Sequence, residues 1–303
     1  MSKPRRTWKQ VHGVLLLDKP LHLSSNDALQ KARRLFSAAK AGHTGTLDPL
    51  ATGLLPVCFG EATKFSADLL DADKAYVADV RLGVTTATGD AEGEVLRSRP
   101  VLVSEEQLEA AVAGFRGPIT QIPPMYSALK RDGKPLYELA RQGLEVEREA
   151  RPVVIHHLEA TDFDGACFRL HVDCSKGTYI RTLAEDIGEV LGCGAHLTAL
   201  RRTRVGPLSL DGAVSLAALE AMDEGERPAV LQPLDSLLQT LPAVDLDEEA
   251  CLRFNHGNPV LVSLTQGKAR AYDKGVLLGV GEVREGKLWP KRLLRQEQEQ
   301  AGS

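Results

Sequence analysis

Strand-like and helix-like segments follow one another along this chain without a regular alternation. Residues 13–17 form a short apolar run typical of a buried strand, and residues 76–84 and 167–173 alternate between apolar and polar side chains as half-buried strands do. Amphipathic helices are predicted over residues 28–36 and 180–191. A doubly wound parallel sheet needs repeated strand–helix–strand units, which this order does not supply. The sequence therefore predicts an α+β fold.

Two serines stand where predicted helices begin. Ser24 precedes Asp27 by three residues, and Ser104 precedes Gln107 by three. This is the spacing of a capping box, in which side chains satisfy the free N–H groups of the first helical turn. We therefore expect a helix to start directly after each serine, and we expect Gly192 to end the helix that follows Ile180.

The length of 303 residues suits one large domain and a smaller one. A boundary is predicted near Leu241 and Pro242, which gives domains at residues 1–241 and 242–303. Short strand-like segments broken by glycines follow it, at residues 259–264, 269–273, 276–283 and 287–293. They predict a small C-terminal β domain or barrel.

The net charge of −4 argues mildly against nucleic-acid binding, but the charges are segregated. Lys3, Arg5, Arg6 and Lys9 stand at the start with no acidic neighbour, whereas Arg227 is the only basic residue between positions 220 and 249. Basic residues return from Lys268 onward. Basic ends around an acidic joint offer RNA a positive track, and an ordinary solvated surface is the alternative.

The sequence shows no sign of a membrane protein, an exported protein or a metal site. No apolar run reaches the ~18 residues that span a bilayer, and no apolar signal core follows the first residues. The five cysteines are odd in number and form no CxxC pair, so neither a disulfide framework nor a zinc site is expected. These features predict a cytoplasmic protein with reduced, mostly buried thiols.

Residues 42–53 are the most informative segment for chemistry. Three glycines allow tight turns and close approach to a ligand, and Pro49 keeps Asp48 out of helical geometry. A loop carboxylate in this setting can serve as a nucleophile or base. Asp before Pro also commonly begins a turn, and local physics alone favours that structural interpretation.

Further candidate residues each have a plain alternative. His43 and Tyr76 can stack on a base, or can be an ordinary loop residue and a core residue. Arg181 can pair with a buried carboxylate or lie on a helix surface. The arginines at 201, 202 and 204 either reach phosphates or are solvated.

Taken together, the motifs resemble the TruB family, the bacterial enzymes that make pseudouridine at uridine 55 in the T loop of tRNA. The resemblance covers roughly the first 205 residues in the family's order and spacing. The matching segments are residues 13–20, 24–26, 42–53, 60–64, 74–76, 124–130, 174–181 and 200–202. A weaker likeness at residues 254–259 points to the family's C-terminal RNA-binding domain of the PUA type.

The resemblance implies a mixed, mainly antiparallel catalytic sheet with flanking helices, and it implies Asp48 as catalytic nucleophile. His43, Tyr76, Tyr179 and Leu200 are implied to contact the substrate: Tyr76 against the flipped base, His43 in the space that the base vacates, and the other two along the pocket. Arg181 is implied to pair with Asp48, with Lys19 and Lys64 as further supports. Residues 124–151 match a mobile loop that closes on RNA.

The same resemblance implies a monomer that acts on the T stem-loop of tRNA with no cofactor, metal or guide RNA. Three chemical routes stay open for Asp48: attack at C1′ of the ribose, addition to C6 of the base, or removal of the 2′ proton. Two rivals also remain, a guide-dependent synthase and an RNA-binding module without catalysis. One departure is His22, at a position where the family usually has Gly, which leaves the shape of that turn open.

Overall fold

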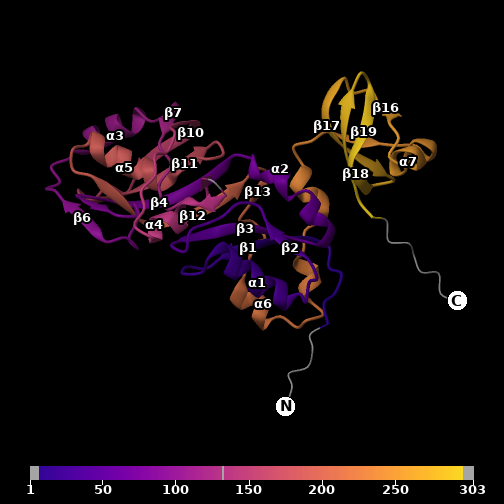
Figure 1. Cartoon of the computed structure of the whole chain (residues 1–303), viewed down its shortest axis with the longest axis horizontal. Coiled ribbons are helices and arrows are strands. Elements are labelled where there is room, and N and C mark those ends of the chain that lie inside the picture. The colour runs from indigo at the N-terminus through magenta and orange to yellow at the C-terminus, as the bar shows by residue number, and fades with distance from the viewer. Residues whose placement is uncertain (1–6, 132, 296–303) are drawn as a thin grey trace, which may run out of the picture.

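The computed structural model describes residues 7–131 and 133–295, so the basic positions Lys3, Arg5 and Arg6 lie outside the described residues. A large ten-stranded sheet forms the body of the described chain, and a five-stranded sheet lies at its C-terminal end (Figure 1). No helix in these two ranges is long and apolar enough to cross a membrane.

The large sheet has the order β14-β1-β3-β12-β4-β11-β10-β7, with β2 paired to β3 and β13 paired to β12. Its strands are β1 (Gly13–Lys19), β2 (Ala41–His43), β3 (Ala51–Phe59), β4 (Lys74–Leu82), β7 (Gly117–Gln121), β10 (Arg151–Thr161), β11 (Cys167–Cys174), β12 (Ala195–Val205), β13 (Leu208–Ser209) and β14 (Val214–Ser215). Within the described part of this sheet, only the pairs β1–β14 and β3–β12 are parallel. The expected α+β class with a mixed, mainly antiparallel sheet is confirmed.

The alternating pattern of β11 places one of its faces in the core, whereas β3 is buried along both faces. Phe168, Leu170 and Val172 of β11 are buried and lie opposite Val80, Ala78 and Tyr76 of β4. Cross-strand pairs of large apolar side chains stabilise such a sheet.

Two pairs of helices pack at opposite ends of the large sheet, whereas the last helix packs on the C-terminal sheet (Figure 1). The helices are α1 (Ser25–Leu35), α2 (Ser66–Leu70), α3 (Glu105–Ala113), α4 (Leu136–Arg141), α5 (Ile180–Val190), α6 (Leu216–Ala221) and α7 (Glu248–Asn255), with 3₁₀ turns η1 (Gly60–Lys64), η2 (Arg227–Val230) and η3 (Leu234–Leu238). Helix α1 contacts α6 beside β1 and β2, whereas α3 contacts α5 near β10 and β11.

The expected helix starts are confirmed. Ser24 accepts a hydrogen bond from Asp27 N, and Ser104 with Gln107 forms a complete capping box. Helix α5 ends at Val190, and Gly192 follows with a φ of +79°, the left-handed conformation that commonly terminates helices.

Two short hairpins project from this framework. One pairs β5 (Val84–Thr86) with β6 (Val95–Ser98), and the other pairs β8 (Lys130–Arg131) with β9 (Lys134–Pro135). The second hairpin lies inside residues 124–151, the segment expected to form a loop over RNA.

The C-terminal sheet has the order β15-β17-β18-β19-β16 and its own apolar core around Phe254 and Leu288. Its strands are β15 (Ala243–Asp245), β16 (Val260–Leu261), β17 (Gln266–Asp273), β18 (Val276–Arg284) and β19 (Lys287–Leu293). Polar contacts join it to the rest of the chain. Asp68 of α2 pairs with Lys268 at 2.7 Å and with Arg292 at 2.6 Å.

Candidate active site

Asp48 lies on the loop between β2 and β3, where Pro49 follows it as expected. The loop does form a turn, because Ala51 N donates to Asp48 O at 3.0 Å. The interpretation of Asp48 as a residue that begins a turn is therefore correct for its backbone. The side chain remains 42% exposed, so its carboxylate is available to a ligand.

A cavity of about 260 Å³ opens in front of this carboxylate. It is lined by Thr46, Leu47, Asp48, Tyr76, Ser127, Ala128, Thr178, Tyr179, Ile180, Arg181 and Leu200. Five of the residues predicted for the site thus meet in one cavity, although they come from the β2–β3 loop, β4, the start of α5 and β12. The approach of β4 to β12 and the packing of α5 on both strands bring these distant segments together.

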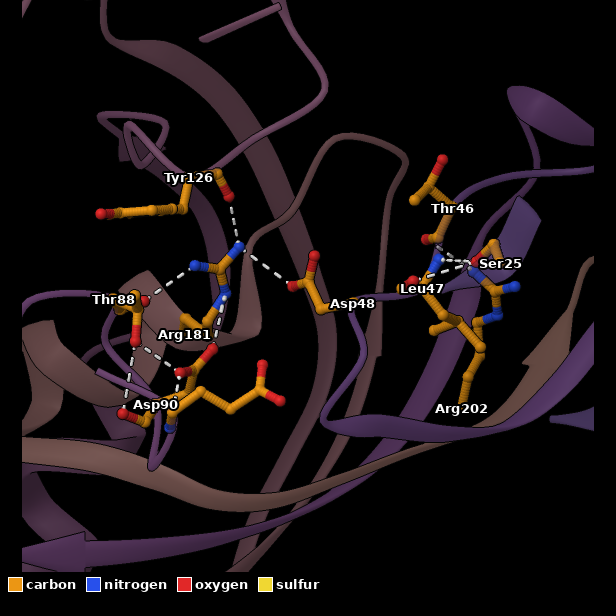
Figure 2. A network of polar contacts seen from close by, with 10 residues as sticks. Ser25, Thr46, Leu47, Asp48, Thr88, Asp90, Tyr126, Arg181 and Arg202 are labelled. Atoms are coloured by element: carbon orange, nitrogen blue, oxygen red, sulfur yellow. Dashed lines mark hydrogen bonds and ion pairs between the residues drawn. The ribbon is translucent and has the colours of Figure 1, made fainter. Parts of the chain in front are cut away.

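Arg181 contacts Asp48 directly, with Nη2 at 3.0 Å from Oδ2 (Figure 2). The arginine side chain is only 5% exposed, and two carbonyls fix it: Nη1 donates to Thr88 O at 2.8 Å and Nη2 donates to Tyr126 O at 2.6 Å. A guanidinium locked in this way holds a carboxylate in one orientation. The alternative of a surface helix arginine is excluded.

Asp90 is a buried partner of the same arginine that sequence reasoning missed. Its Oδ2 lies 3.7 Å from Arg181 Nε, and its Oδ1 accepts from Thr88 Oγ1 and from Glu92 N (Figure 2). In the sequence Asp90 stands in a Gly-Asp turn, where an aspartate needs no functional explanation. No local signal distinguishes it.

The two tyrosines of the cavity present neutral aromatic rings. Burial raises the pKa of Tyr76, and the neighbouring positive charge of Arg202 opposes that rise. Burial likewise raises the pKa of Tyr179. Both phenols therefore stay protonated at neutral pH and offer apolar faces to a planar ligand.

Lys19 lies fully buried behind the Asp48 loop. Its ammonium donates to Leu23 O at 2.6 Å, to Pro20 O at 2.9 Å and to Pro49 O at 3.5 Å. Burial lowers its pKa to about 8, against the attraction of Asp48. These contacts suit the supporting position that the resemblance implies.

His43 and Lys64 do not line the cavity. His43 lies in β2, where burial and then the charge of Arg202 lower its pKa, and its Nδ1 is buried without a hydrogen-bond partner. Lys64 binds Glu61 Oε2 at 2.5 Å and Leu293 O at 2.9 Å. Its contacts therefore lie at the junction with the C-terminal sheet and not at the pocket.

Arg202 departs from its expected place. It is 1% exposed, so it neither reaches phosphates nor is solvated, because its guanidinium turns inward to carbonyls of the Asp48 loop and of β3. Its neighbours do lie at the surface: Arg201 pairs with Asp18 and Arg204 with Asp173. Side chains alternate along a strand, which explains why Arg201 and Arg202 face opposite ways, and a register shift between Arg202 and Arg204 breaks the alternation before Arg204.

Three structural findings bear on other kinds of site. In residues 7–131 and 133–295, no group of three or more His, Cys, Asp or Glu side chains is placed to hold a metal ion. All five cysteines are free, and only Cys167 is not fully buried. A larger cavity of about 610 Å³ beside α3 is lined by Glu105, Glu106, Glu109 and Asp162, an acidic set that would repel phosphates.

The His22 turn has the conformation that a glycine would favour. His22 has a φ of +65°, and its N–H donates to Pro49 O at 2.9 Å. The chain therefore has His where the family usually has Gly, but the turn keeps the left-handed conformation and its contact with the Asp48 loop.

Comparisons with known proteins identify the family. Residues 33–180 match the N-terminal domain of the TruB family pseudouridylate synthases, residues 181–239 match the tRNA pseudouridylate synthase B C-terminal domain, and residues 242–294 match the C-terminal model of pseudouridine synthase II TruB. The tRNA pseudouridine synthase B of Dechloromonas aromatica is 63% identical over 293 residues, covering 96% of this chain and 98% of the relative. That of Cupriavidus metallidurans is 60% identical over 304 residues, with coverages of 96% and 97%.

Solved structures give the same fold. A Cbf5-Nop10-Gar1 complex contains a chain that matches with a TM-score of 0.72 and 26% identity, over 97% of this chain and 90% of that one. The archaeal box H/ACA sRNP Nop10-Cbf5 complex matches with a TM-score of 0.71 and 25% identity, over 95% and 88%. Because the family models and the relatives cover nearly the whole chain, the chain belongs to the TruB family of pseudouridylate synthases, which are isomerases.

Proposed function

We propose that this chain converts uridine 55 in the T loop of tRNA to pseudouridine, with Asp48 as its catalytic carboxylate. The observation that carries the proposal is the ion pair between Asp48 and the buried Arg181 at a cavity that also contains Tyr76, Tyr179 and Leu200. The relatives at about 60% identity are tRNA pseudouridine synthases B, which supports tRNA as the substrate.

The reaction keeps all atoms of the nucleotide. The bond between C1′ and N1 breaks, the uracil turns, a bond forms between C1′ and C5, and the proton on C5 moves to N1 by way of solvent or protein groups. No oxidant or energy source is needed, because the product is an isomer of the substrate. An ionised carboxylate supports this chemistry by adding to C1′ or to C6, or by removing the 2′ proton.

Access to C1′ requires the uridine to leave the T loop. Extrusion of a stacked base costs a few kcal/mol, and stacking on a protein aromatic ring returns roughly 1–3 kcal/mol. Tyr76 and Tyr179 provide such rings in the cavity. We assign Tyr76 to the face of the flipped base, and we assign His43, outside the cavity, to the space left in the RNA.

We also propose a division of roles between two domains, residues 1–241 and 242–303, and the two separate sheets support it. The C-terminal sheet has its own core and carries basic residues at exposed positions, among them Lys287. We assign RNA binding to this domain. Removing residues after Leu241 is expected to raise the Kd for tRNA at least tenfold and to change the rate constant at saturating RNA much less. Unchanged catalysis at limiting RNA would contradict this assignment.

A test of the main proposal uses the purified chain and a T-stem-loop RNA with no guide or cofactor. We expect pseudouridine at position 55 by nucleoside analysis, and none in a matched RNA with cytidine there. Asp48→Asn is expected to bind the same RNA and to leave it unmodified. Absence of product with the unaltered chain would favour the guide-dependent rival, and normal turnover by Asp48→Asn would remove Asp48 from its role.

A further inference from the structure

The loop that carries Asp48 is fixed from its buried side by two residues from distant parts of the chain. Ser25 is the first residue of α1, and Arg202 lies in β12 (Figure 2). Both side chains contact backbone groups of residues 45–47, directly before Asp48. Neither residue lines the cavity in front of the carboxylate.

Ser25 makes two hydrogen bonds with one residue. Its Oγ accepts from Leu47 N at 2.7 Å and donates to Leu47 O at 2.9 Å. Ser25 is 1% exposed and Leu47 is 4% exposed, so water does not replace these bonds when the hydroxyl is removed. The hydroxyl thus satisfies both backbone groups of Leu47, as a neighbouring strand would.

Arg202 holds the preceding two residues and the strand behind them. Its Nε donates to Leu54 O at 2.8 Å, its Nη2 to Gly45 O at 3.3 Å and its Nη1 to Thr46 O at 3.5 Å. Within the part of the chain that the structure describes, no carboxylate lies at ion-pair distance from this guanidinium. A buried cation with carbonyl partners resists displacement of the loop, because moving residues 45–46 would remove two of its three carbonyl partners.

The backbone of Arg202 adds a second constraint. Arg202 pairs with Gly53 across the parallel strands β12 and β3. Gly53 has a φ of +97°, and a Cβ there would meet Arg202 O at 2.2 Å. The strand that begins after Asp48 is therefore pressed against the strand that carries the arginine, so Arg202 fixes the loop from both of its ends.

We propose that Ser25 and Arg202 are positioning residues of the reaction, which hold residues 45–47 so that the Asp48 carboxylate faces Arg181 and the cavity. The proposal rests on the proposed catalytic role of Asp48. Its physical basis is the steep dependence of rate on geometry, since a misplacement of about 1 Å at a reacting group costs roughly 100-fold in rate. Support from rigid buried groups is what keeps such a residue in place.

The first test compares Ser25→Ala with Ser24→Ala. Both remove one hydroxyl from adjacent positions at the start of α1, but Ser24 caps the helix and has no contact with Leu47. Single-turnover rate constants at saturating T-stem-loop RNA, RNA Kd values and Tm are measured for each. We expect Ser25→Ala to be slower by at least about tenfold with an RNA Kd within twofold of the unaltered chain. Ser24→Ala is expected to lower Tm without slowing the reaction.

The second test removes the hydrogen bonds of Arg202 in two steps. Arg202→Lys keeps a charge that reaches fewer of the three carbonyls, and Arg202→Met keeps only the length of the chain. We expect both to be slow, the methionine variant more so, with RNA Kd unchanged. Leu158→Ala leaves a cavity in the core at β10 and serves as the control for a variant that loses only stability.

The outcomes separate the two levels of the proposal. Rate constants for Ser25→Ala and Arg202→Lys equal to that of Leu158→Ala, at matched loss of Tm, would overturn the positioning role. So would a fall in rate at limiting RNA that disappears at saturation. If Asp48→Asn is inactive in the same assay while both variants are fast, only the positioning role fails, whereas an active Asp48→Asn removes the proposed function itself.

Discussion

Arg181 Nη2 lies 3.0 Å from Asp48 Oδ2 in the lining of the cavity, with the arginine buried in α5 and the aspartate half-exposed on a loop. Replacing Arg181 by Lys removes the planar fork that also reaches two backbone carbonyls. We expect a roughly 10²–10³-fold lower single-turnover rate constant with little change in RNA Kd. Arg204→Lys, at a partly exposed ion pair, is the control and should stay within about twofold.

Asp90 holds the far side of the same guanidinium. Asp90→Asn keeps an oxygen for Thr88 and Glu92 N but loses the charge that faces Arg181. We expect single-turnover catalysis to slow by about tenfold, because the arginine becomes freer to move. Asp162→Asn, which removes an exposed carboxylate beside Arg169, should have no effect on that rate. A full rate with Asp90→Asn would mean that the carbonyls alone fix Arg181.

The lowered pKa of Lys19 leads us to expect opposite pH dependences for activity and stability. The folded protein releases its proton at about pH 8, whereas the unfolded chain keeps it to about pH 10.5. Between these values the unfolded state binds more protons, so the contribution of Lys19 to stability rises with pH. The positive charge near Asp48 is lost over the same range. We expect the single-turnover rate constant at pH 9 to be roughly a tenth of its plateau.

The control for this prediction is Lys74, whose pKa burial also lowers to about 8 but whose contacts are the carbonyls of Leu70 and Ala72. Lys74→Met should keep the alkaline fall in rate, and Lys19→Met should be slow at every pH. A rate profile of the unaltered chain that stays flat to pH 9.5 would contradict the role of the Lys19 charge.

His22 carries a measurable strain. A residue with a Cβ pays about 1 kcal/mol in the left-handed region, which glycine avoids, and the exposed imidazole has little packing to lose. His22→Gly should therefore raise the free energy of unfolding by about 1 kcal/mol, measured by denaturant titration. His22→Ala keeps the Cβ and should show no gain. Equal stability of the two variants would argue against relief of backbone strain.

Sequence patterns predicted the elements of this fold well where one strong local signal existed. The spacing of Ser104 and Gln107 predicted the start of a helix, and the alternation of Phe168, Leu170 and Val172 predicted a half-buried strand. The segment at 259–264 was predicted as a strand, but only Val260–Leu261 pairs, because β16 is a short edge strand against β19. Edge pairing depends on partners that a local pattern does not contain.

The site was predictable only through motifs that act together. Asp48 alone reads as a turn residue, and the resemblance connected it to Tyr76, Tyr179, Arg181 and Leu200, which the structure brings to one cavity. Their roles in the reaction stay predictions. Asp90 and the inward turn of Arg202 had no local signal, because burial of a polar group is decided by the packing of distant strands.

The contacts of Asp68 with Lys268 and Arg292, beside an apolar cluster that joins Val280 of β18 to Phe65 and Leu237, set where the C-terminal sheet lies. They tie the C-terminal sheet to α2, a short distance along the chain from β3 and hence from the Asp48 loop. An RNA that touches both the C-terminal sheet and the cavity must present its uridine at the distance that this tie sets. If the C-terminal sheet binds RNA as proposed, the choice among the many uridines of a folded RNA would depend on their distance from the bound stem as well as on the bases beside the target.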